Sequence, residues 1–450
     1  MKAKVGIRIF TIWSLLLVAF ILRVVLMNWS FQHTLHKDIF RFRDWAMIPY
    51  VHSLTDPYAG KHITFGIDPL NLPPGTLYIL TSMYRVNILA AKVILNITHT
   101  DPGSLQWVNI QLTNAFLRLP NFIADLLTGY LIYAMVKKYK DEKKALLASS
   151  LYLLNPSVLY NGAFWGQMDA INNALFFLGV FLFLYHKKLL SILSLFFSLY
   201  IKLTLIVVIA PLLGAMVLLD KNKGKIILYG AFAIALLLFM TFPISSMPHV
   251  WFWQFLQKNS LGEMNNITSL AFNVWWVIFK ARIEIGQPIT DFLFTQDRFV
   301  GSPESSTVFF GLSLFVWAIL LFTIVSLPLL RAVMRLKEKI FTPHVLFLLL
   351  AMLSLIGYLF LPHMHERYLF PFLSLMATSI GFTNRNVWIF IGISLLNFLN
   401  LYIVWHPMIH PALPYGLMNS VDFQWLLSVA TVALGILLYI RSVKYIHTIR

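Results

Sequence analysis

The chain has 450 residues, of which 59% are hydrophobic and 12% charged, and its formal net charge is +17. A soluble globular protein carries about 25% charged residues, so this composition excludes a soluble fold. Apolar runs close to 20 residues recur from end to end, which predicts an all-α polytopic membrane protein. The absence of cysteine excludes disulfides, thiolate catalysis and cysteine metal sites. Most basic residues lie in short loops between apolar runs, which argues against a nucleic-acid partner.

These basic loops set the predicted topology, because the positive-inside rule places them in the cytoplasm. The first apolar run lacks a small-residue cleavage site and is interpreted as an anchor. The count closes only if residues 187–225 hold two short spans, which puts Lys202 at an outer turn. With both termini inside, the twelve predicted spans are 10–28, 113–136, 145–161, 170–186, 189–201, 203–219, 225–243, 307–330, 344–361, 368–384, 387–405 and 424–440.

Two long loops, 29–112 and 244–306, then fall on the outer side. The apolar stretch 74–97 carries Arg85 and Lys92, which predicts a helix lying in the membrane interface. There is no internal repeat and no low-complexity linker, so residues 1–450 are interpreted as one membrane domain with a structured outer face.

The first polar cluster on that face follows the first span and contains Asp38, Asp44 and Trp45. Because the two acids are six residues apart, they point to different faces of a helix, and one lines a site while the other meets water. Two ordinary solvated loop acids are an equally good interpretation of the pattern.

The second span carries Arg118 and Asp125 seven residues apart, which favours a buried structural pair. Gln167 and Asp169 begin the fourth predicted span. The helix dipole is a sufficient reason for an acid in a first turn, so a cap is favoured over ligand contact. Lys202 is a lone cation in an apolar run, and its partner is an anion such as phosphate unless the side chain snorkels.

The densest polar cluster is the stretch 363–368 (HMHERY) between two apolar runs. Its spacing differs from the zinc motif HExxH, because the residue four beyond His365 is Leu369. Arg367 supplies a fork-shaped donor suited to phosphate. An interfacial anchor of aromatic and basic side chains is the simpler alternative.

Together these clusters resemble the GT-C superfamily of membrane glycosyltransferases. The closest likeness is to bacterial and archaeal mannosyltransferases related to the enzyme that adds the second mannose to glycosylphosphatidylinositol, with a weaker likeness to dolichol-phosphate-glucose enzymes. The WGQMDA and HMHERYLFP stretches carry most of the specificity, and the shared order of motifs adds to it. The matching stretches are 38–45, 72–78, 118–125, 155–156, 165–169, Lys202, 271–275 and 363–368.

The resemblance implies a GT-C-like bundle of about 12 transmembrane helices whose long extracytoplasmic loops carry interfacial helices. It also implies a polyprenyl-phosphate sugar as donor, with mannose as the family's suggestion, and an active site facing away from the cytoplasm of a prokaryotic cell. Asp38 matches the family's general base. The adjacent Asp-Glu pair of some members has no counterpart, because Ile39 follows Asp38, and the basic Arg41 and Arg43 leave Asp44 as a fallback base.

The chemistry of glycosyl transfer assigns roles to the remaining groups. A base takes the proton of the acceptor hydroxyl, and positive groups stabilise the leaving phosphate, so inversion without a metal or cofactor is expected. The predicted phosphate-binding residues are Lys202, Arg367 and His365. The predicted sugar- or acceptor-binding residues are Trp45, Gln167, Asp169, His363 and Glu366. The expected partners are the lipid-linked donor, a glycan, lipid or protein acceptor, and membrane lipids.

Two other functions fit the composition. A flippase or transporter of a lipid-linked sugar predicts functional charges at mid-membrane depth and matched discontinuous helices. A non-catalytic scaffold for a cell-envelope glycan complex predicts no transfer at all. The gathering of polar groups on one side favours the enzyme.

Overall fold

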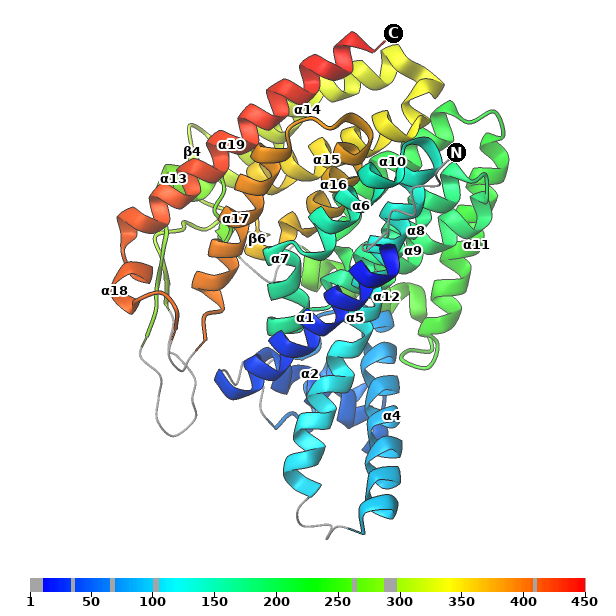
Figure 1. Ribbon diagram of the computed structural model, residues 1–450, viewed down its shortest axis with the longest axis vertical. Helices are drawn as coiled ribbons and strands as arrows, with labels where there is room; N and C mark the ends of the chain where they lie inside the picture. Colours follow the sequence, from blue (N-terminus) through cyan, green and yellow to red (C-terminus); the bar gives the residue numbers. More distant parts are fainter. Residues whose placement is uncertain are drawn as a thin grey trace, which may run out of the picture.

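The computed structural model describes residues 11–33, 37–64, 69–99, 105–260, 265–286, 298–407 and 411–449. Most of this part is helical (Figure 1), and its strands are only two or three residues long. The all-α class predicted from the composition is therefore confirmed.

The elements follow one another along the chain without a break into separate domains. Those of the first half are α1 (Ile12–His33), α2 (Lys37–Val51), α3 (Asp56–Ala59), α4 (Pro74–Thr98), α5 (Leu105–Tyr139), α6 (Glu142–Leu153), α7 (Pro156–Leu159), the π-helical turn η1 (Tyr160–Trp165), α8 (Asp169–Leu184), α9 (Lys188–Ile201), the short turn η2 (Leu203–Leu205), α10 (Ile206–Leu219) and α11 (Lys223–Thr241). Those of the second half are α12 (Pro248–Ser260), β1 (Thr268–Ser269), α13 (Val274–Phe279), β2 (Arg282–Glu284), β3 (Arg298–Val300), β4 (Val308–Phe309), β5 (Leu312–Ser313), α14 (Leu314–Leu336), η3 (Lys337–Phe341), α15 (Pro343–Phe360), β6 (Met364–His365), η4 (Glu366–Leu369), α16 (Phe370–Thr383), α17 (Val387–Val404), α18 (Tyr415–Met418) and α19 (Val421–Thr448).

Within the described residues, eight helices are long and apolar enough to cross a membrane, which makes the chain a multi-pass membrane protein. Every predicted span has helix over it, with ends shifted by a few residues, but the number twelve stays a prediction. The helix Pro74–Thr98, expected in the interface, is among the eight by length and composition. The eight are Ile12–Gln32, Pro74–Thr98, Gln111–Tyr139, Lys223–Thr241, Leu314–Phe341, Pro343–Phe360, Val387–Val404 and Val421–Thr448, with shorter apolar helices at Asp169–Leu184, Lys188–Ile201 and Leu203–Leu219.

The interior of the bundle is formed by α5, α8, α15 and α16. Of the most apolar stretch of α15, 78% of residues are buried, against 17% in α11 and in the span of α14. α8 packs on α5 and α9, and α15 packs on α16. The many exposed apolar side chains of α11 and α14 therefore face lipid, as a membrane bundle requires.

The α8–α9 hairpin is joined by a row of hydroxyl groups. Small side chains let two helices approach closely, and a hydroxyl buried in lipid needs an acceptor. The row places the start of α8, with Asp169, beside the end of α9, with Lys202. Its three bonds run from Ser191 to the carbonyl of Gly179 at 2.7 Å, from Ser194 to Leu175 at 2.6 Å and from Ser198 to Asn172 at 2.7 Å.

One predicted pair is wrong, because Asp125 binds Arg23 of α1 and not Arg118. The Arg23 guanidinium lies 3.1 Å from the Asp125 carboxylate, and both side chains are fully buried. Arg118 donates instead to the carbonyl of Phe164 at 2.9 Å and to Ser30 Oγ at 3.0 Å. A seven-residue spacing does put Arg118 and Asp125 on one face of α5, but α1 packs on α5 and brings its own cation closer.

The second outer loop is joined to the HMHERY stretch by a short parallel ladder. β1 pairs with β6, with Thr268 opposite Met364 and Ser269 opposite His365. The backbone N–H of His363 also donates to the carbonyl of Ile267 at 2.9 Å. In the first loop, α4 pairs with α5, and this pair extends beyond the rest of the bundle (Figure 1). Both long loops thus have structured elements, as predicted.

Candidate active site

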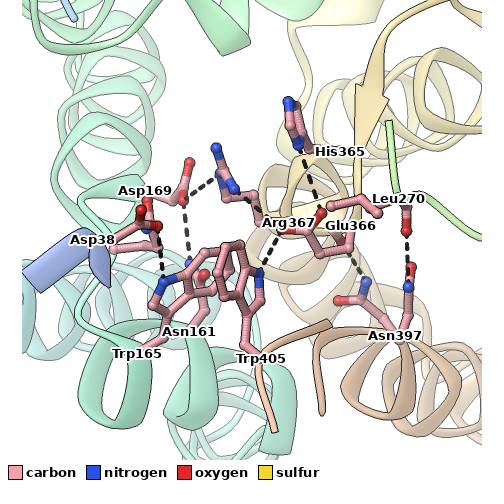
Figure 2. Close-up of polar contacts among 12 residues, drawn as sticks. Asp38, Asn161, Trp165, Asp169, Leu270, His365, Glu366, Arg367, Asn397 and Trp405 are labelled. Carbon is pink, nitrogen blue, oxygen red and sulfur yellow. Dashed lines mark hydrogen bonds and ion pairs between the residues drawn. The ribbon is translucent and has the colours of Figure 1, made fainter. Parts of the chain in front are cut away.

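Segments far apart in the sequence meet at one end of the bundle. They are the start of α2, the stretch from η1 into α8, the residue between α9 and η2, the HMHERY stretch, and the end of α17. Figure 2 shows Arg367 reaching toward Asp169, with Asp38 beside Trp165 and with Trp405 beneath Glu366. Most of the polar residues singled out in the sequence therefore lie in one place.

The Asp38 carboxylate is oriented by side chains that follow η1. Its Oδ2 accepts hydrogen bonds from Trp165 Nε1 at 3.2 Å and from Gln167 Nε2 at 2.9 Å. Its Oδ1 lies 3.4 Å from Arg41 Nη1, one turn along α2. The side chain keeps 14% of its exposure. An oriented carboxylate that is still reachable from outside has the geometry of a general base.

The turn that carries Trp165 and Gln167 has an uncommon backbone. η1 is π-helical, a form found frequently at functional sites, and it ends at Gly166 with φ +87°. A Cβ added at Gly166 would lie 2.8 Å from Arg118 Nε. Since Arg118 also holds the carbonyl of Phe164, this buried cation of α5 supports the turn that orients Asp38.

We expect Gly166→Ala to lower stability by about 1–3 kcal/mol, because the left-handed backbone and the contact with Arg118 both oppose a side chain. Thermal unfolding of the purified protein measures the effect. Gly224→Ala is the matched control, since no atom lies within 4 Å of its added Cβ. Equal melting temperatures for the two variants would contradict the prediction.

Asp169 and Lys202 form a buried ion pair across the α8–α9 hairpin. Lys202 Nζ lies 2.6 Å from Asp169 Oδ1, and the two side chains are 7% and 5% exposed. Asn161 Nδ2 lies 3.4 Å from the other carboxylate oxygen. Burial lowers the pKa of Lys202, and the charge of Asp169 opposes that change. The lone cation of the sequence thus has an acid partner from the preceding helix.

Arg367 is held between Glu366 and two stacked tryptophans. Its Nη1 lies 3.1 Å from Glu366 Oε1, which also accepts from Trp405 Nε1 at 2.9 Å. The guanidinium carbon lies 5.1 Å from the ring centre of Trp165, whose ring is 4.1 Å from that of Trp405. Arg367 Nε is 3.9 Å from Asp169 Oδ2, so one network joins the two ion pairs.

The charges of this network are stable at any pH used for assays. Burial opposes ionisation of Glu366, but the hydrogen bond from His365 and the charge of Arg367 outweigh it and hold its pKa at about 2. Burial likewise opposes the charge of Arg367, but Glu366 outweighs it and raises the Arg367 pKa above its usual value. Glu366 therefore serves as a fixed negative charge that orients Arg367.

His365 is neutral at this site. Burial, followed by the charge of Arg367, lowers its pKa below the ordinary value of 6.5. Its Nδ1 lies 3.6 Å from Glu366 Oε2. The imidazole is thus a hydrogen-bonding group at pH 7, and it adds no positive charge beside Lys202 and Arg367.

Because a lowered histidine pKa keeps the ring neutral as pH rises above about 6.5, His365→Gln is expected to remove no charge at pH 7. We expect the pH profile of activity between 6.5 and 8 to keep its shape in this variant. Steady-state rates across that range check the prediction. A step near pH 7 in the wild type that His365→Gln abolishes would show that the ring carries the titration.

A cavity of about 280 Å³ opens beside Lys202. The polar part of its wall includes His363, His365 and Tyr368, and the apolar part includes Val207 and Leu361 among others. His363 has φ +60°, and its ring meets that of Phe315 edge-on. Glu366 is fully buried behind this wall and is not part of it. The cavity offers polar groups at one side and a greasy surface at the other.

Asp44 and Trp45 lie on the buried side of α2. Asp44 is fully buried, and its Oδ2 accepts from the backbone N–H of Thr64 at 2.9 Å, which fixes the loop after α3. Trp45 is 4% exposed and packs in the hydrophobic core beside Phe42. The six-residue spacing therefore separates the two acids, and it is Asp38 that lies with the other site residues.

The sequence offered no signal for α17, which supplies two supports of this site. Asn397 Nδ2 donates to the backbone carbonyl of Glu366 at 2.8 Å, and Trp405 holds its carboxylate. Both residues stand in an ordinary apolar run or at its end. Trp165 lies in a stretch that the sequence marked, but its two roles, toward Asp38 and toward Arg367, needed the fold.

Among the described residues, no group of three or more His, Asp or Glu side chains is placed to hold a metal ion. The acids of the site face cations, with Asp169 on Lys202 and Glu366 on Arg367. A reaction without a metal stays a prediction, and chelation tests it directly.

No family model matches the chain, and no curated protein matches it. Two solved structures are similar to it at low identity. One is the oligosaccharyltransferase of Archaeoglobus fulgidus in its apo form, with a TM-score of 0.43 and 14% identity over 97% of this chain and 56% of that one. The other is the oligosaccharyltransferase AglB from Archaeoglobus fulgidus, in complex with an inhibitory peptide and a dolichol-phosphate, with a TM-score of 0.41 and 12% identity over 98% and 56%. This chain thus spans about half the length of those proteins, and scores this low carry no argument about its function.

Proposed function

We propose that the chain is a membrane glycosyltransferase that moves a hexose, with mannose the first candidate, from a polyprenyl-phosphate donor to a glycan, lipid or protein acceptor. The reaction takes place on the extracytoplasmic face. One observation carries this proposal: the Asp38 carboxylate lies with Lys202 and Arg367 at the same end of the bundle. A base and phosphate-stabilising cations are what glycosyl transfer from a lipid phosphate requires.

In the proposed reaction, Asp38 takes the proton of the acceptor hydroxyl as its oxygen attacks the anomeric carbon. The bond from that carbon to the phosphate oxygen breaks, and its electron pair leaves with the polyprenyl phosphate. The configuration at the anomeric carbon inverts. Lys202 and Arg367 stabilise the charge that develops on the phosphate, so the reaction needs no metal.

The other site residues divide into those that orient and those that bind. Gln167 orients Asp38, Asp169 orients Lys202, and Glu366 orients Arg367, as their hydrogen bonds support. His363 and His365 line the cavity and bind sugar hydroxyls in this proposal.

The test is transfer of radiolabelled sugar from a panel of polyprenyl-phosphate donors into membrane extracts by the purified protein in nanodiscs. We expect label in an acceptor, one polyprenyl phosphate released per sugar, and an unchanged rate after EDTA. If no donor is used while vesicles containing the protein move a fluorescent lipid-linked sugar between leaflets, the flippase function replaces the proposal. If neither occurs, the scaffold does.

A further inference from the structure

A second cavity lies at the opposite end of α9 from Lys202. It has a volume of about 390 Å³ and sits between the turn from α8 to α9 and the start of α11. α9 has 14 residues, so it holds the two sites about 20 Å apart. The loops around this cavity are among those that the positive-inside rule places in the cytoplasm.

The walls of this cavity carry more positive charge than they neutralise. Lys187, Lys188 and Lys225 line it. Lys188 binds Asp220 at 2.5 Å. Within the described part of the chain, neither Lys187 nor Lys225 has a carboxylate at ion-pair distance. Ammonium groups this close together repel one another, and an anion between them would remove that repulsion.

The backbone around the cavity adds to the positive potential. α9 and α11 pack side by side, and both begin here. Neither helix has a side chain capping its first turn or an acid within it. α6 differs, since Asp141 caps it by accepting from the N–H of Lys144. The first-turn N–H groups of α9 and α11 thus add partial positive charge to that of the lysines.

Below this basic rim the surface is apolar. Leu190 lines the cavity and is 53% exposed, and Tyr229 lines it from α11. Ile227 and Leu228, which neighbour Tyr229 in sequence, are also largely exposed. These side chains belong to the part of the bundle that faces acyl chains, so the site offers cations to a headgroup and an apolar surface to a tail.

We propose that this cavity binds the headgroup of an anionic phospholipid, with the phosphate between Lys187 and Lys225 and the acyl chains along α9 and α11. Basic pockets between membrane helices on the cytoplasmic side bind such headgroups. The site is separate from the candidate active site and does not depend on the proposed reaction. A bound lipid holds together two helices, of which α9 carries Lys202 at its far end.

The test is a lipid titration of the purified full chain, read by native mass spectrometry. The probes are phosphatidylglycerol and phosphatidylcholine with identical acyl chains, and inorganic phosphate without lipid. The site variant is Lys187→Gln/Lys225→Gln. The control Lys143→Gln/Lys144→Gln removes the same charge from another cytoplasmic loop. Lys187→Arg/Lys225→Arg keeps the charge and shows that substitution there leaves the protein folded.

We expect phosphatidylglycerol to bind in preference to phosphatidylcholine, and its affinity to fall roughly tenfold or more in the site variant. The control and the arginine variant should stay within about twofold of the wild type. An equal loss in the site variant and the control would show general surface attraction and overturn the proposal. Equal binding of both lipids would overturn it as well, and inorganic phosphate binding as tightly as phosphatidylglycerol would make free phosphate the ligand.

Discussion

Replacing Asp38 by Asn is expected to slow sugar transfer by about 10²–10⁴-fold, because the variant keeps the shape of the side chain but not its ability to take a proton. The amide oxygen still accepts from Trp165 and Gln167, which hold the wild-type carboxylate at 3.2 and 2.9 Å. The fold should therefore be unaffected. Single-turnover transfer in nanodiscs, with thermal unfolding measured in parallel, gives both quantities.

Asp44→Asn is the matched control, since it makes the same change at the other acid of α2. Asp44 is fully buried and holds the backbone of Thr64, so its loss should act on stability and leave the rate of the folded fraction within about tenfold of the wild type. If Asp44→Asn stops transfer in folded protein while Asp38→Asn does not, Asp44 is the base.

The second large effect is expected from Arg367→Lys, which should lower the rate of transfer by about 10²–10³-fold. Lysine keeps the positive charge that the fully buried Glu366 needs, so the protein should still fold. It lacks the planar fork that lies over Trp165 and faces both Glu366 and Asp169. Rates measured at saturating donor separate this loss from weaker donor binding.

Arg41→Lys provides the comparison for this variant. Arg41 lies 3.4 Å from Asp38 on the other side of the site, where it faces the base. The same exchange there should change the rate by less than about tenfold. Similar rates for Arg41→Lys and Arg367→Lys would show that the position of Arg367 has no particular importance for the leaving phosphate.

The helical architecture was predictable because length and hydrophobicity decide which segments enter a membrane. The break at Lys202 was predictable for the same reason, as one charge divides an apolar run too long for one span and too short for two ordinary ones. The first-loop acid and the HMHERY cluster were visible as polar groups that hydrocarbon would reject. These are local properties of the chain.

The partners of those groups were not predictable, because they come from other helices. Asp125 has Arg118 on its own helix face, but Arg23 binds it from α1. Glu366 depends on Trp405, which stands 39 residues later in a stretch without a distinctive pattern. One sequence reports the spacing within a helix, and only the packing of helices decides which of two candidate cations lies nearer to an acid.

The shortness of the α8–α9 hairpin has a consequence for the membrane itself. α9 is about 21 Å long, less than the roughly 30 Å of a hydrocarbon core, while α14, with 23 residues, is about 34 Å long. A span too short for the bilayer thins it locally. Beside the hairpin the outer leaflet should therefore dip, and water and headgroups should descend toward Lys202. A lipid-borne phosphate then meets its cations without leaving the depth at which its own headgroup neighbours lie.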